Sequence, residues 1–162
     1  MTFSGFLALA LVLLPAVPSA DCSAVGPESA AWRLAKTSVF EMHVPLGYVY
    51  RPVEAKDGLI GKWVRKGKGD QSAIIFTLSA PFKPQAEYTN STCSEIVDRR
   101  EARVETGIGP TGRYFVRITW LQELAGYPGL QLVVWADTAN PAEQLEALAA
   151  LRTIKVLSNG GA

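Results

Sequence analysis

The sequence predicts a single-domain α+β protein, in which a mostly antiparallel, twisted β-sheet carries a C-terminal α-helix packed on it. Three observations predict this fold class. Apolar and polar residues alternate in many short runs, and glycine and proline separate these runs at short intervals. One capped amphipathic segment lies near the end of the chain.

The centre of the chain has the clearest strand pattern. Apolar and polar side chains alternate over 102–106, 116–120 and 130–136, where β-branched and aromatic residues are frequent. Glycine and proline separate these runs at 107–112 and 126–129. Because the connections are too short for a parallel crossover, we expect an antiparallel meander.

The N-terminal residues have the layout of a secretory signal peptide. No charged side chain occurs before Asp21, and an apolar run over 6–14 is followed by small residues ending at Ala20. Pro18 departs from the usual small residue three positions before a cut after Ala20. The apolar run is too short to span a bilayer as a mature helix, and an uncleaved anchor is the alternative.

This layout divides the chain into three parts. We expect a signal peptide over 1–20, one α+β domain over 21–157 and a disordered tail over 158–162. The protein is then secreted or periplasmic, with no membrane span after cleavage.

A first hairpin is expected at the start of the domain. Trp32 and Leu34 form a short alternation, a turn follows at 36–38, and a second alternation covers 40–44. A short alanine-rich helix over 28–36 is the alternative.

A second hairpin follows. Its arms are 61–66 and 73–78, joined by glycine-rich turn residues, and an edge segment or loop over 47–52 precedes it. Residues 80–92 contain two prolines and no apolar period, which predicts a long loop. A short strand is expected at 95–97.

The last element is the clearest helix. Asn140 is the expected N-cap, Pro141 takes the first helical position, and Glu143 lies where a capping box has its acid. The helix is expected to end near 151–152, and 154–157 to add an edge strand. The expected buried stripe consists of Ala142, Leu145, Leu148 and Ala149.

The chain has two cysteines, Cys22 and Cys93. In an exported chain such a pair is most simply a disulfide bond. This bond would join the start of the mature chain to the central sheet. The alternative, a reactive thiol, requires a base and an electropositive pocket that the sequence does not indicate.

The charge balance excludes some partners. With 16 basic and 15 acidic residues the net charge is +1, which provides no field to attract nucleic acid. Lysines and an arginine flank Trp63 over 62–68, but a solvated hairpin end explains them. We therefore expect no nucleic-acid partner.

No motif indicates a catalytic residue, a metal site or a cofactor. The segment 107–112 satisfies G-x-G-x-x-G, but a strand is expected after it, where a dinucleotide site requires a helix. His43 is the single histidine and is expected on the surface beside Glu41. One histidine and a paired cysteine set do not make a usual zinc site.

The best candidate for a binding patch lies on the second face of the central sheet. Arg103, Glu105 and Arg117 are polar positions that the alternation places on this face, which we expect to be exposed. Cross-strand ion pairing without a binding role is the alternative.

Four segments, 95–104, 112–116, 129–134 and 143–154, resemble in their order the PsbP-like group of small secreted α+β proteins. The resemblance covers about residues 32–157 and is one of layout. It implies a sheet backed by the terminal helix and a binding or accessory role, and it carries over no functional residue.

The sequence therefore favours an exported, non-enzymatic binding or accessory domain with an unidentified protein or small-molecule partner. The first alternative is a small hydrolase that uses acidic residues and His43 on an exposed sheet face. A purely structural component of the cell envelope is the second alternative.

Overall fold

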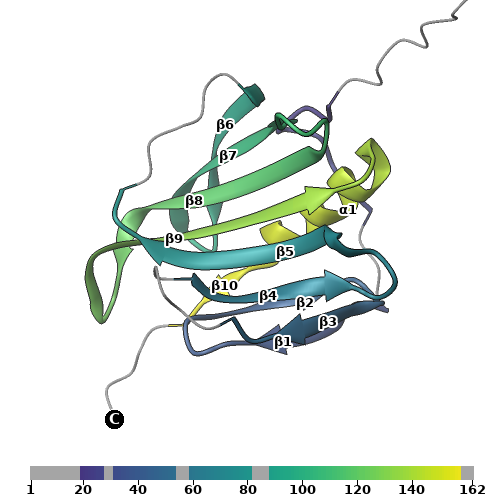
Figure 1. Ribbon diagram of the computed structural model, residues 1–162. Coiled ribbons are helices and arrows are strands. Elements are labelled where there is room, and N and C mark those ends of the chain that lie inside the picture. The colour runs from purple at the N-terminus through teal and green to yellow at the C-terminus, as the bar shows by residue number, and fades with distance from the viewer. Residues whose placement is uncertain (1–18, 28–30, 54–58, 82–87, 158–162) are drawn as a thin grey trace, which may run out of the picture.

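The structure is a computed structural model that describes residues 19–27, 31–53, 59–81 and 88–157 (Figure 1). These residues form ten β-strands and one α-helix near the C-terminus, so the expected mostly antiparallel α+β architecture is confirmed. The elements are β1 (Arg33–Lys36), β2 (Phe40–Val44), β3 (Tyr48–Arg51), β4 (Leu59–Arg65), β5 (Gly69–Ser79), β6 (Thr89–Val97), β7 (Arg100–Ile108), β8 (Tyr114–Leu124), β9 (Tyr127–Thr138), α1 (Pro141–Arg152) and β10 (Lys155–Val156).

A seven-stranded antiparallel sheet forms most of the molecule, in the order β3-β4-β5-β9-β8-β7-β6. The predicted meander β7-β8-β9 is confirmed: Val104 pairs with Ile118, which pairs with Val134. All three side chains are fully buried, as the alternation predicts. The predicted second hairpin is confirmed as β4-β5, and β5 continues the sheet by pairing with β9.

The first hairpin is also confirmed, but it belongs to a separate sheet. β1 and β2 pair antiparallel, and β10 adds to the other edge of β2. The expectation of one sheet is therefore wrong, because the chain returns after α1 and completes a three-stranded sheet around β2. The alternative of a helix over 28–36 is wrong at 33–36, which form β1, and 28–30 lie outside the described residues.

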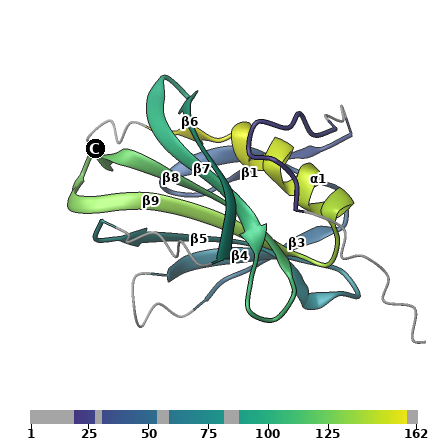
Figure 2. The ribbon, with the colours of Figure 1, turned by 90° about the horizontal axis from the view of Figure 1, so that it is seen from above.

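The two sheets and α1 share one core (Figure 2). Phe40 of β2 packs edge-to-face on Phe76 of β5, with ring centroids 5.1 Å apart, and Trp63 of β4 lies 5.3 Å from Phe76. The helix contacts β8, β9 and β2. Burial of these aromatic rings against one another holds the small sheet on the large one.

The helix begins as predicted. Asn140 accepts a hydrogen bond from the backbone N–H of Glu143, at 2.9 Å, and Pro141 occupies the first turn. The predicted buried stripe is only partly right, because Ala142 is exposed and Leu145 half-buried. The buried residues are Gln144, Ala147, Leu148, Ala149, Ala150 and Leu151.

The predicted loop over 80–92 is shorter than expected. β6 already begins at Thr89, and the strand expected at 95–97 is its end. The alternation of β6 is hard to recognise because the half-buried positions are taken by Ser91, Cys93 and Glu95 instead of aliphatic residues. The signal peptide expected over 1–20 and the tail over 158–162 lie outside the described residues, apart from Ser19 and Ala20.

Candidate functional site

The two cysteines form the expected disulfide bond. Cys22 is joined to Cys93 of β6 with Cα atoms 5.9 Å apart and a sequence separation of 71 residues. Arg152, in the last turn of α1, pairs with Glu95 at 3.0 Å and donates to the carbonyl oxygens of Cys22 and Ala24. The bond and this arginine fasten the segment 19–27 to the sheet and the helix.

This region does not offer a metal site. Among the described residues, Asp21, Cys22 and Cys93 are the acid and thiol groups that lie close enough to share an ion. Both sulfur atoms are already bonded to each other, which leaves one carboxylate.

The structure brings together the three residues of the predicted patch. Glu105 of β7 is directly opposite Arg117 of β8 in the sheet register, and Arg103 precedes Glu105 by two residues on the same face. The Glu105 carboxylate accepts a hydrogen bond from Arg117 Nε at 2.9 Å, and Arg103 Nε lies 3.4 Å from the same oxygen.

The patch is much less exposed than expected. The side chain of Glu105 is 1% exposed and that of Arg117 is 9%, whereas that of Arg103 is 24%. Both arginines therefore share one buried carboxylate, which a ligand would have to displace. Ion pairing across the strands, the alternative reading, describes this arrangement well.

The residues of the hydrolase alternative lie apart. His43 is exposed on β2, where its neighbours in the strand, Met42 and Val44, face the core. Glu105 belongs to the other sheet, and its neighbour Val104 faces the core from that side. Alternation along the two strands therefore directs His43 and Glu105 away from the shared core on its two sides.

Two further patterns have structural explanations. The segment 107–112 ends β7 and forms the hairpin loop to β8, with Gly112 at a φ of +72°, so the helix that a dinucleotide site needs does not follow it. Trp63, within the basic segment 62–68, is 2% exposed and unavailable for stacking on a base. Arg65 and Lys68 of this segment pair with acids of α1.

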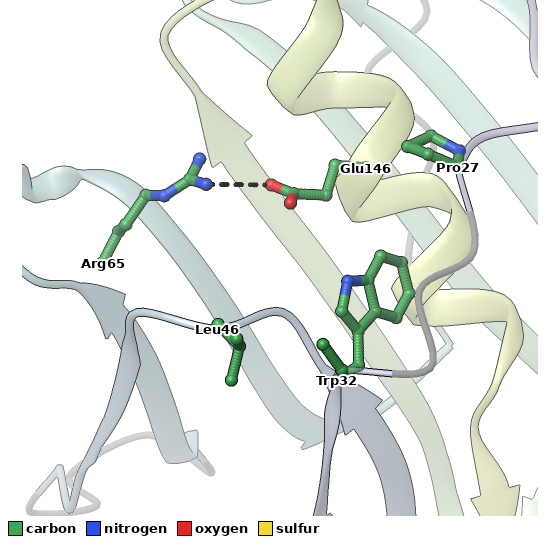
Figure 3. A pocket seen from close by; sticks show the side chains of 6 residues that line it. Pro27, Trp32, Leu46, Arg65 and Glu146 are labelled. Carbon is green, nitrogen blue, oxygen red and sulfur yellow. Dashed lines mark ion pairs between the residues drawn. The ribbon is translucent and has the colours of Figure 1, made fainter.

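A hollow with a volume of about 320 Å³ lies beside α1, where the two sheets meet (Figure 3). Its walls come from the N-terminal segment, the two residues just before β1, the β2–β3 connection, the end of β4 and the helix. The residues that line it are Pro27, Ala31, Trp32, Leu46, Arg65 and Glu146.

The turn between β2 and β3 positions one wall of the hollow. Gly47 adopts a φ of +92°, which a residue with a side chain rarely adopts, and its carbonyl accepts from the N–H of Lys66 at 2.8 Å. This turn presents Leu46, which is 59% exposed, while Trp32 is half-buried. The hollow therefore has apolar side chains that a ligand can reach.

Charged side chains close the opposite wall. Arg65 Nη2 lies 3.2 Å from Glu146 Oε2, and Arg65 Nη1 lies 3.5 Å from Glu143 Oε1. Lys68 Nζ lies 3.7 Å from the same Glu143 oxygen. Burial of Glu143 acts to raise the pKa of its carboxyl, but a hydrogen bond from Ser72 and the nearby cations outweigh burial and lower the pKa. Glu143 is thus a fixed anion that helps to orient Arg65.

Tyr48 lies behind this charged wall. Burial raises the pKa of its hydroxyl to about 12, an effect that Arg65 opposes and that Glu146 and Glu143 reinforce. The Arg65 guanidinium lies 5.5 Å from the centre of the Tyr48 ring. The ring and the two glutamates hold the arginine at the edge of the hollow.

No pattern in the sequence indicates the hollow, because its walls come from five separate segments of the chain. Comparison with known proteins finds no family model that matches the chain, and no curated protein matches its sequence. No helix among the described residues has the length and apolar character needed to cross a membrane.

Proposed function

We propose that the chain is an exported, non-enzymatic binding domain, and that the hollow beside α1 is its binding site. The observation that carries this proposal is the combination of accessible apolar side chains with one charge pair in a single concavity. A volume of about 320 Å³ lies at the lower end of the range of small-molecule sites, roughly 300–1,000 Å³. Apolar walls with a few fixed polar groups are typical of such sites.

The lining defines the class of ligand. Trp32, Leu46 and Pro27 favour an aromatic or branched aliphatic group, and the adjacent Arg65 and Glu146 favour a charged group at its end. A small amphipathic molecule, or one apolar side chain at a peptide terminus, meets both demands. The side chains of Arg65 and Glu146 are 26% and 24% exposed, so a ligand can reach this pair without entering the sheet, whereas Glu105 is 1% exposed.

Export is the second part of the proposal. The disulfide bond is compatible with a periplasmic or extracellular location, where such bonds persist. The charge-free apolar start of the sequence supports export as a signal peptide. An accessory role like that implied by the resemblance to the PsbP-like group stays a prediction, as does a binding role for Arg103, Glu105 and Arg117.

Two matched leucine variants test the binding site. Leu46 in the hollow and Leu34 on β1 outside it are both 59% exposed, so their replacement by alanine removes similar exposed surface. The purified protein is screened by protein-observed NMR against small aromatic and branched aliphatic carboxylates and amines. We expect Leu46→Ala to weaken binding several-fold and Leu34→Ala to leave it unchanged.

The charge pair is tested in the same screen. Arg65→Gln should weaken binding of carboxylates more than that of amines, and Glu146→Gln should do the reverse. Equal effects of the two leucine variants, or hits that shift only resonances around Glu105 and Arg117, would refute the hollow as the site.

A further inference from the structure

The segment 19–27 lies against α1 and the sheet (Figure 2). The disulfide at Cys22 and the hydrogen bonds from Arg152 hold its middle. Gly26 packs closely on the helix, since a Cβ built there would lie 2.1 Å from the carbonyl oxygen of Leu145. The segment is therefore fitted to this surface along its length.

Gln144 clamps the start of this segment. Its side chain is fully buried on α1, and its Nε2 donates to the carbonyl oxygens of Phe115 at 2.7 Å and Gly107 at 3.3 Å. Its Oε1 accepts from the backbone N–H of Ala20 at 2.8 Å. The hydroxyl of Thr106, also fully buried, donates to the carbonyl oxygen of Ala20 at 2.6 Å. Both backbone polar groups of Ala20 are thus bound by buried side chains.

Ser19 is bound differently, because each Gln144 atom that contacts it also has another partner. Its hydroxyl lies 2.9 Å from Gln144 Nε2 and 3.3 Å from Oε1. Gln144 Nε2 has two hydrogens and three acceptors within reach, namely the Phe115 carbonyl oxygen at 2.7 Å, Ser19 Oγ at 2.9 Å and the Gly107 carbonyl oxygen at 3.3 Å, so Gly107 can accept when Ser19 is absent. Loss of Ser19 leaves the amide bonded, whereas loss of Ala20 as well removes the donor to Oε1 and the acceptor for Thr106.

We propose that the leader is removed by cleavage between Ser19 and Ala20, and that Gln144 and Thr106 form the binding site for the mature N-terminus. This inference rests on the export proposed above. A leader peptidase hydrolyses the Ser19–Ala20 amide bond with one water molecule. The carboxylate stays on Ser19, and the new ammonium group on Ala20 donates to Gln144 Oε1.

The sequence supports this bond over the next one. A cut after Ser19 has Ser19 and Val17 at the first and third positions before it. A cut after Ala20 has Pro18 at the third position, where the ring fixes φ and removes the N–H. The mature chain then keeps Ala20, the residue whose backbone the fold binds on both sides.

The first test is the N-terminus of the exported protein. The full chain is expressed with its own leader in a secreting host, and the exported fraction is analysed by intact mass and N-terminal sequencing. We expect a chain that begins with Ala20. A chain that begins with Asp21 or any other residue would overturn this cleavage site and leave export intact, whereas an uncleaved chain would overturn both proposals.

The second test examines the binding site for the N-terminus directly. Chains that begin at Ala20 and at Asp21 are released from a removable fusion partner, and their thermal unfolding is compared. Two buried hydrogen bonds should raise the Tm of the Ala20 form by about 3–8 °C. Gln144→Leu, which removes the acceptor for the Ala20 N–H, and Thr106→Val, which removes the donor to the Ala20 carbonyl oxygen, should each reduce this difference. Equal Tm values for the two forms would overturn the assignment.

Discussion

Removal of the disulfide bond by the double substitution Cys22→Ser and Cys93→Ser should destabilise the protein strongly. The bond closes a loop with a sequence separation of 71 residues. In the chain-entropy account, a cross-link of this span removes enough freedom from the unfolded chain to stabilise the fold by about 4 kcal/mol. That loss is a large part of the stability of an ordinary domain, roughly 5–15 kcal/mol.

The folded state of this variant should change little. Arg152 still donates to the carbonyl oxygens of Cys22 and Ala24, and Gln144 still accepts from Ala20, so the segment 19–27 stays docked. The free energy of unfolding therefore falls because the unfolded chain gains conformational freedom and expands when the cross-link is absent. Expansion exposes more surface on unfolding, so the denaturant m-value should rise while the NMR spectrum of the sheet is retained.

Equilibrium urea unfolding of both proteins measures the effect, with the reduced wild-type protein as the control for the serine substitutions. A loss of stability below about 1 kcal/mol, well under the chain-entropy value, would refute the reasoning. An unchanged m-value together with altered sheet resonances would also refute it, because the loss of stability would then come from a change in the folded structure.

Three further substitutions test other parts of the fold. Glu105→Leu should lower the free energy of unfolding in urea by about 3–5 kcal/mol, because Arg117 stays buried without this carboxylate. Adding Arg117→Met should recover much of this loss, and no recovery would contradict the ion-pair account. The wild-type protein should lose stability as pH rises from 10 to 12, because Tyr48 has a pKa of about 12 in the folded protein and near 10 in the unfolded chain. Tyr48→Phe should abolish this loss. The control Tyr50→Phe, at an exposed tyrosine, should retain it. Asn140→Ala should cost about 1 kcal/mol, and no measurable change would exclude its role as the helix cap.

The central meander was predictable because each strand has one apolar face. Val104, Ile118 and Val134 each fall on the expected face, and their pairing brings these faces together. The order of distant strands was not predictable. β5 pairs with β9, and β10 with β2, across long stretches of chain, and alternation within one strand does not specify such a partner.

Polar side chains that bind other parts of the chain explain why the start of β6 and the buried face of α1 were predicted incorrectly. Ser91 of β6 and Gln144 of the helix accept from backbone N–H groups of the N-terminal segment, and Glu95 of β6 pairs with Arg152, which donates to the same segment. Sequence patterns assign such residues to the surface, since polar side chains are mostly exposed. The docked segment that binds them is irregular and gives no periodic signal of its own.

The candidate site was only partly predictable for a similar reason. The strand pattern put Arg103, Glu105 and Arg117 on one face, and the structure joins them, but burial depends on the layers around the sheet. The hollow could not be found from sequence, because Trp32, Leu46 and Arg65 meet only after the two sheets pack together.

A crystal structure with the tightest-binding amphipathic compound from the NMR screen tests the central claim most directly. We expect density for its apolar group beside Trp32 and Leu46, with its charged group against Arg65 or Glu146. Density for the compound at Arg103 on the opposite face of the large sheet, with the hollow left empty, would contradict the proposal.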